Sequence, residues 1–142
     1  MVSTVAVGTD GSQTASDAVR MAVDVARRFD ARLVLLSAFQ DTGAPPAAAP
    51  RGSKELDWVV STSARVREIL SRTEAEVRAD GVDCTTRVDE GDAAEVLVQL
   101  ANECEADLLV IGNKGMRRRV LGSVPNTITH KAPCSVLVVK TT

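Results

Sequence analysis

The sequence has very few aromatic side chains and only one histidine. Aromatic residues make up 2% of the 142 residues, with no tyrosine and a single tryptophan. Proteins that bind single-stranded nucleic acids stack bases on aromatic rings, and those that bind duplexes carry a basic surface. A formal net charge of −2 supplies no such surface. We therefore expect no nucleic-acid partner.

Cysteine pairs and long apolar segments are also lacking. The three cysteines, Cys84, Cys104 and Cys134, are widely spaced and form no Cys-x-x-Cys motif. This pattern is typical of buried thiols in a reducing compartment and not of disulfides or a metal site. No stretch reaches the ~18 apolar residues that span a bilayer, and the first residues do not resemble a signal peptide. We expect a cytoplasmic protein without a membrane partner.

The catalytic motifs of common hydrolases are missing. The sequence contains no Gly-Lys-Ser of a Walker A loop, no His-Glu-x-x-His and no Gly-x-Ser-x-Gly. His130 follows Ser123 by two helical turns, roughly 10 Å, so it cannot act as a base for this hydroxyl. We expect no catalytic residues and, at most, slow ATP hydrolysis.

What the chain does contain is a regular alternation of apolar runs and helical patterns. Short apolar runs predict strands, and the segments between them show apolar residues at intervals of three and four. This order predicts a single domain over residues 1–142, with a parallel sheet covered by helices on both faces. Ser12 and Asp92 are the expected N-caps. The predicted strands lie at 4–8, 33–38, 82–88, 108–111 and 135–139, and the predicted helices at about 12–29, 56–80, 92–104 and 124–131.

A glycine series follows the fourth predicted strand. Gly112, Gly115 and Gly122 lie between an apolar run and a helix that starts near Ser123. Glycines let backbone N–H groups approach an anion, and a helix N-terminus favours phosphate. The loop at residues 9–11 follows the first strand, so both loops meet at one crevice if strands one and four are neighbours. This arrangement predicts a nucleotide or another phosphorylated ligand.

Four segments resemble the universal stress protein family: residues 5–12, 110–116, 121–126 and 132–139. The resemblance extends over the whole chain. It implies a flavodoxin-like (Rossmann-like) α/β three-layer sandwich with a five-stranded parallel sheet of order 3-2-1-4-5. It also implies a homodimer, a role as a stress-response sensor or regulator and, in one branch of the family, a bound ATP with Mg²⁺ or Mn²⁺.

The resemblance also assigns roles to individual residues. Gly112, Gly115, Gly122 and Ser123 match the ATP motif, but six residues instead of nine separate the second and third glycines. The shorter loop contains Arg118 within a run of three arginines, which either binds phosphate or is solvated. Cyclic AMP therefore remains an alternative ligand. The expected contacts are Asp10 to the ribose or a metal, Ala38 and Phe39 to adenine, and Asn113 and Ser123 to the phosphates. Thr9 and Val124 are further expected nucleotide-binding residues.

Several alternatives stay open. Asp10 could instead cap the first helix, and Ser123 could be only the N-cap of the fourth. Other functions for such a chain are an adenylyl-transferring enzyme, a receiver domain that is phosphorylated at Asp89 after the third strand, and an interaction or chaperone protein that binds no nucleotide. The final apolar strand would be an exposed edge without a partner, so we expect a dimer interface at Val136, Leu137, Val138 and Val139.

Overall fold

The computed structural model describes residues 1–40, 62–113 and 122–140. Within these residues, a parallel sheet has the order β3-β2-β1-β4-β5, which confirms the predicted order. The strands are β1 (Thr4–Gly8), β2 (Arg32–Phe39), β3 (Cys84–Glu90), β4 (Leu108–Gly112) and β5 (Ser135–Val139). The helices are α1 (Gln13–Phe29), α2 (Ser63–Ala79), α3 (Ala93–Glu103) and α4 (Ser123–Lys131).

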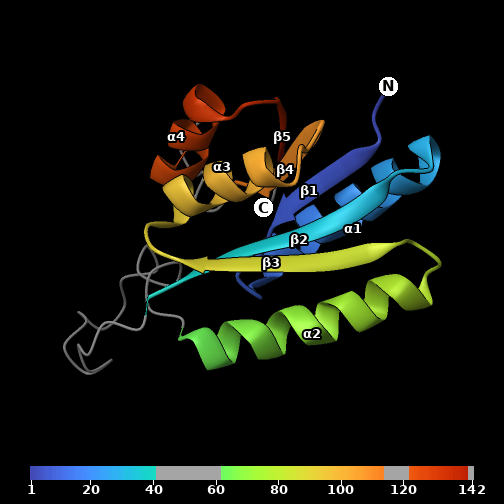
Figure 1. Ribbon diagram of the computed structural model, residues 1–142, viewed down its shortest axis with the longest axis horizontal. Helices are drawn as coiled ribbons and strands as arrows, with labels where there is room; N and C mark the ends of the chain where they lie inside the picture. Colours follow the sequence, from blue (N-terminus) through green and yellow to red (C-terminus); the bar gives the residue numbers. More distant parts are fainter. Residues whose placement is uncertain (41–61, 114–121, 141–142) are drawn as a thin grey trace.

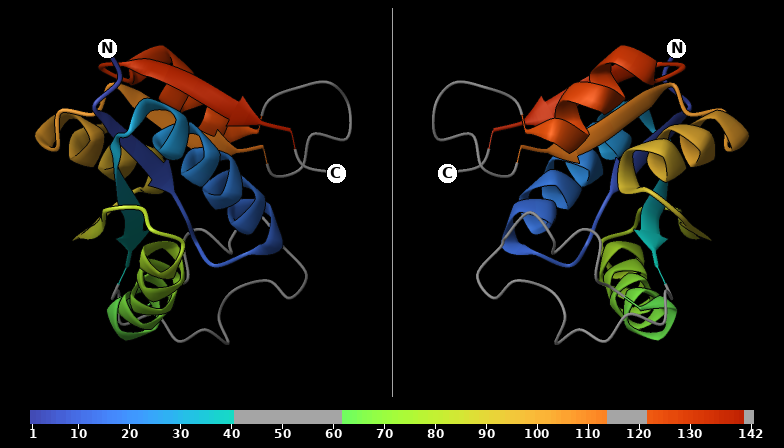
Figure 2. Two further views of the ribbon diagram at one scale, coloured as in Figure 1. Left: turned by 90° about the vertical axis from the view of Figure 1, so that its right-hand side faces the viewer. Right: turned by 90° about the vertical axis from the view of Figure 1, so that its left-hand side faces the viewer.

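Two helices cover each face of the sheet (Figures 1 and 2). Helices α1 and α2 pack on one face, where Val5, Leu33 and Leu35 lie in the same apolar cluster. Helices α3 and α4 pack on the other face, against Leu36 and Leu109. Every residue of β1 is buried, because the central strand of a parallel sheet is covered on both sides. The part of the chain described here contains no helix long and apolar enough to cross a membrane.

The two edges of the sheet are β3 and β5. The polar side chains of β3 suit its edge position, and its exposed residues include Arg87 and Asp89. The prediction that Asp89 follows this strand was wrong. Asp89 lies inside β3 in register with Ala38, and its Oδ1 accepts a hydrogen bond from the Glu90 N–H at 2.7 Å.

The helix caps follow local side-chain chemistry. Ser12 Oγ accepts from the Ala15 N–H, and Asp92 Oδ2 accepts from the Glu95 N–H, both at 3.2 Å. Both caps confirm the prediction. The first part of the helix expected from residue 56 lies outside the described residues, within which α2 begins after a Thr62 cap.

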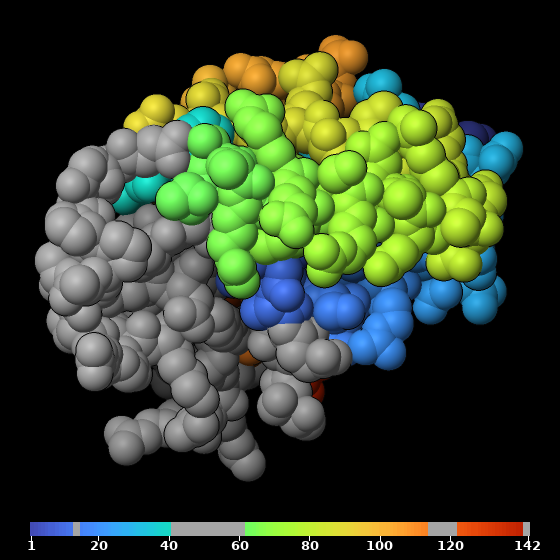
Figure 3. Space-filling model, turned by 90° about the horizontal axis from the view of Figure 1, so that it is seen from below, coloured from blue at the N-terminus to red at the C-terminus, as the bar shows by residue number. Residues whose placement is uncertain are grey.

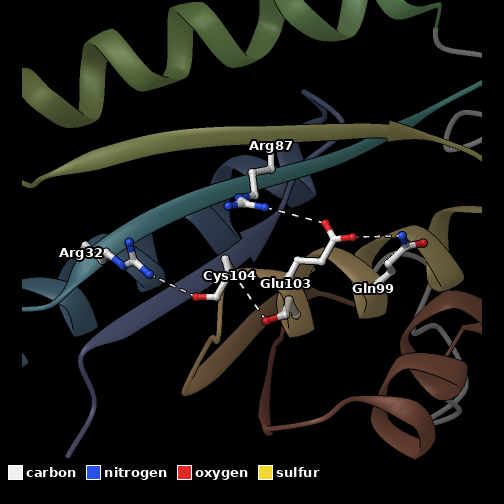
Figure 4. A network of polar contacts seen from close by, with 6 residues as sticks. Arg32, Arg87, Gln99, Glu103 and Cys104 are labelled. Atoms are coloured by element: carbon white, nitrogen blue, oxygen red, sulfur yellow. Dashed lines mark hydrogen bonds and ion pairs between the residues drawn. The ribbon is translucent and has the colours of Figure 1, made fainter.

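Polar contacts tie α3 to the two strands beside it (Figure 4). The guanidinium of Arg32 on β2 donates to the Cys104 carbonyl at 3.2 Å. Arg87 on β3 lies 3.7 Å from the Glu103 carboxylate, which also accepts from Gln99 at 3.1 Å. These contacts connect the end of α3 to β2 and β3.

Candidate functional site

The candidate site lies at the carboxyl edge of the sheet, where β1 and β4 end side by side. Val7 pairs with Val110 across these strands, which confirms the adjacency on which the predicted crevice depends. Thr9 and Asn113, the residues just after the two strands, are 2% and 0% exposed. The Thr9 N–H donates to the Leu36 carbonyl, and the Asn113 N–H donates to the Val139 carbonyl. Both residues are therefore held by the sheet itself.

The loop from β1 to α1 is stabilised by hydrogen bonds between its own side chains and backbone. Asp10 Oδ1 accepts from the Ser12 N–H at 2.9 Å, and Thr9 Oγ1 accepts from the Gly11 N–H at 3.3 Å. Gly11 has a φ of +82°, which strains any residue with a Cβ. Ser12, not Asp10, is the N-cap of α1, so the alternative expectation for Asp10 was wrong. Asp10 is half-buried, and the Oδ2 atom of its carboxylate is buried.

The first turn of α4 carries backbone donors. Its N-cap is Gly122, which has no side chain to cap the helix, so the alternative of Ser123 as N-cap was wrong. The N–H groups of Ser123 and Val124 come before the first residue that can donate within the helix, and Pro125 has no N–H. They lie at the positive end of the helix dipole, where an anion is stabilised. The Ser123 side chain is exposed and Val124 is half-buried.

The last two residues of β2 direct their side chains to opposite faces of the sheet. Ala38 is 5% exposed and packs in the cluster beneath α3 and α4, whereas Phe39 is half-buried on the face of α1 and α2. Successive residues of a strand point to opposite faces, so the two side chains cannot line the same surface. The guanidinium of Arg67 on α2 lies 6.0 Å from the centre of the Phe39 ring.

The centre of the predicted phosphate loop falls outside the described residues. Gly115 and Arg118 both belong to residues 114–121. The described part of the site is therefore the pair of strand ends, the loop at residues 9–12, the end of β2 and the start of α4.

Helix α2 reaches this region, which sequence reasoning missed. A Cβ placed on Gly11 would lie 2.8 Å from Cδ1 of Ile69. A groove of about 480 Å³ begins at Thr9 and Gly11 and continues between α1 and α2. These two helices lie side by side on the face shown in Figure 3. No local signal could reveal this contact, because Gly11 and Ile69 are far apart in the chain.

The cysteines offer no reactive thiolate at neutral pH. Burial raises the pKa of Cys84 to about 11 and also raises the pKa values of Cys104 and Cys134. All three are free. Cys84 and Cys104 are buried, as predicted, whereas Cys134 is only half-buried just before β5, so the prediction was wrong for this residue. In the described ranges, no group of three acidic, histidine or cysteine side chains is arranged to hold a metal ion.

Known proteins resemble this chain over nearly its full length. The model of the Universal stress protein family matches residues 1–140. Universal stress protein Rv1636 of Mycobacterium tuberculosis is 37% identical over 143 residues, covering 98% of this chain and 97% of the relative. Universal stress protein MJ0531 of Methanocaldococcus jannaschii is 31% identical over 139 residues, covering 96% of this chain and 81% of the relative.

Solved structures agree with this match. A universal stress protein crystallised in complex with cAMP has a TM-score of 0.76 and 34% identity, with 99% of each chain covered. The Archaeoglobus fulgidus universal stress protein in complex with dAMP has a TM-score of 0.71 over 99% of this chain and 98% of that one; at 21% identity it supports the fold alone. The sheet order, the strand ends and these relatives lead to one conclusion: the chain belongs to the universal stress protein family.

Proposed function

We propose that this universal stress protein binds an adenine nucleotide at the carboxyl edge of β1 and β4 and acts as a stress-response regulator with little or no turnover. The observation that carries the proposal is the convergence of Thr9 and Asn113, both buried polar residues, at the ends of neighbouring parallel strands. Ligands of open α/β sheets bind at such a point. The uncapped first turn of α4 adds donors for a phosphate.

Each part of the site has a role in this proposal. Ser123 and Val124 donate backbone N–H groups to the phosphate, with Gly112, Gly115, Gly122 and Arg118 forming the rest of its loop. The Asp10 carboxylate accepts from the ribose hydroxyls, since an ionised carboxylate is only an acceptor. Phe39 offers an apolar surface to the base, and the backbone of Ala38 lies beside it.

ATP, with Mg²⁺ or Mn²⁺, is the first candidate ligand, because the spacing of Gly112 and Gly115 and the Gly122-Ser123 pair match the ATP motif. Cyclic AMP is the second candidate. It is favoured by the six-residue interval between Gly115 and Gly122, which leaves less chain to surround three phosphates. The relative crystallised with cAMP, at 34% identity, also supports cyclic AMP as a candidate ligand.

Low turnover follows from the positions of the available bases. His130 lies in the last turn of α4 and is exposed, two turns from Ser123. Hydrolysis of a phosphoanhydride needs a group that orients the attacking water. The proposed site therefore binds a nucleotide and turns it over slowly at most.

We also propose that the protein is a homodimer joined along β5. Val136, Leu137 and Val138 are half-buried on this edge strand, while Val139 is buried. An apolar edge strand is protected when a second copy pairs with it.

Calorimetric titration of nucleotide-stripped protein with ATP–Mg²⁺ and, separately, with cyclic AMP tests the function. Gly122→Glu places a negative charge at the start of α4 and should weaken binding at least tenfold, while Gly122→Gln, which has the same shape without the charge, is the matched control. The ligand that binds more tightly identifies the nucleotide class. An absence of heat with both ligands would reject the proposal and favour an interaction or chaperone role without a nucleotide.

A further inference from the structure

We propose that Ile69 of α2 is a positioning residue for the loop of residues 9–12, and that it acts by contact with Gly11. The effect on ligand affinity rests on the proposed function, whereas the effect on the loop itself does not. Ile69 touches no expected ligand atom in this proposal. It sets the place of Gly11, whose N–H and whose neighbour Ser12 orient the side chains of Thr9 and Asp10.

The contact between Ile69 and Gly11 is close, and Ile69 alone supplies the nearest atoms. The three atoms nearest to a Cβ on Gly11 all belong to Ile69, at 2.8, 3.0 and 3.3 Å. The loop therefore lies directly on the isoleucine side chain, with no room for a methyl group between them. A β-branched side chain is stiff at χ1. The Thr73 hydroxyl also donates to the Ile69 carbonyl at 2.9 Å, within the same helix.

The position of Gly11 controls the residues on either side of it. The Asp10 carboxylate is held by the Ser12 N–H, and the Thr9 hydroxyl by the Gly11 N–H. A shift of Gly11 would therefore move the donors that orient both side chains. The hydrogen bond from the Gly11 N–H is long at 3.3 Å, so this bond alone is a weak restraint on the position of Gly11.

A second contact connects the same segment of α2 to the end of β2. Arg67, two residues before Ile69, places its guanidinium 6.0 Å from the centre of the Phe39 ring. One turn of α2 thus contacts both the loop after β1 and the last residue of β2. These are the two segments to which the proposed function assigns the ribose and the base.

The groove between α1 and α2 explains why the contact of Ile69 with Gly11 affects the position of the loop. It separates α1 from α2, and its apolar lining includes Val19, Val23 and Val77. At its far end, Arg27 of α1 donates to the Asp80 carbonyl at 2.8 Å. At its near end, Ile69 meets Gly11. Helix α2 is therefore placed against the β1–α1 unit at both ends of the groove, and the near end is at the proposed site.

The test compares three variants in nucleotide titrations and in hydrogen exchange. Ile69→Ala removes the contact, and Ile69→Val keeps the branched carbon as a conservative rescue. Val77→Ala is the matched control, because Val77 is 3% exposed and lines the same groove two turns further along α2. We expect Ile69→Ala to raise the Kd roughly tenfold, as when the competent fraction of a loop falls to a tenth. We expect Ile69→Val and Val77→Ala to stay within about twofold of the wild type.

Exchange of the Gly11 and Ser12 amides provides a readout without any ligand. We expect both amides to exchange faster in Ile69→Ala and at the wild-type rate in Val77→Ala, even where Val77→Ala is the less stable protein. Wild-type exchange at both amides in Ile69→Ala would overturn the inference. Binding by the wild type with an unchanged Kd in Ile69→Ala would overturn it too, whereas failure of the wild type to bind any nucleotide would reject only the proposed function.

Discussion

At the scale of single residues, Asp107 joins the starts of two central strands. Its Oδ2 accepts from the Ser3 and Thr4 N–H groups at 2.8 and 2.9 Å, and its own N–H donates to the Thr4 carbonyl. Thr4 begins β1 and Leu108 begins β4. These backbone donors favour the ionised carboxylate and lower the pKa of Asp107 below its ordinary value of 3.8. The charge therefore supports the pairing of β1 with β4.

We predict that Asp107→Asn lowers the free energy of unfolding at pH 7 and that this deficit shrinks in acid. Because the folded state has the lower pKa, the carboxylate stabilises the fold above its ordinary value of 3.8 and loses this effect as the pH falls through the lowered value. Urea denaturation at pH 7 and at pH values below 3.8 measures the deficit. Asp24→Asn, at an exposed position of α1, controls for the loss of one negative charge. A deficit that does not change with pH would contradict this account.

At the scale of elements, the approach of α3 to β1 depends on one glycine. A Cβ on Gly8 would lie 2.9 Å from Cδ1 of Leu97, which is fully buried. Gly8 is the last residue of β1. The same contact therefore sets the distance between α3 and the sheet at the edge that carries the site. The absence of a side chain at Gly8 lets the helix and strand pack closely.

A double-mutant cycle measures this contact. We predict that Gly8→Ala costs about 1–3 kcal/mol by overpacking, and Leu97→Ala about 2–5 kcal/mol by leaving a cavity. The double variant should be more stable than the sum of the two losses implies, because the new methyl group enters the space that Leu97 leaves. Urea denaturation of the four proteins gives the interaction free energy. Additive losses of unfolding free energy would show that the packing of α3 does not depend on its contact with Gly8.

Element order and caps were predictable from the sequence because their causes are local. Ser12 and Asp92 bond to backbone groups three residues away, and apolar periodicity identified the buried faces. The site was only partly predictable. The contact of Ile69 with Gly11 joins two elements far apart in the chain. Such packing depends on tertiary structure, which no local pattern encodes.

At the scale of the whole molecule, the two edges of the sheet differ in charge. The edge strand β3 carries Arg87, Asp89 and Glu90, and charged side chains discourage pairing with another chain. The edge strand β5 has no charged residue, and three of its five residues are half-buried apolar side chains. The contrast supports the proposed dimer at β5 and argues against pairing at β3.

We predict that Val138→Lys converts the proposed dimer into monomers. Val138 is half-buried at the β5 edge, and a lysine can keep its apolar stem on the protein while its charge opposes pairing with a second copy. Thr85→Lys, at an exposed position of β3, is the matched control and should leave the dimer intact. Light scattering measures the mass of each variant, and circular dichroism verifies that each is folded. A folded Val138→Lys dimer would exclude β5 as the interface, and monomers formed by Thr85→Lys alone would assign it to the opposite edge.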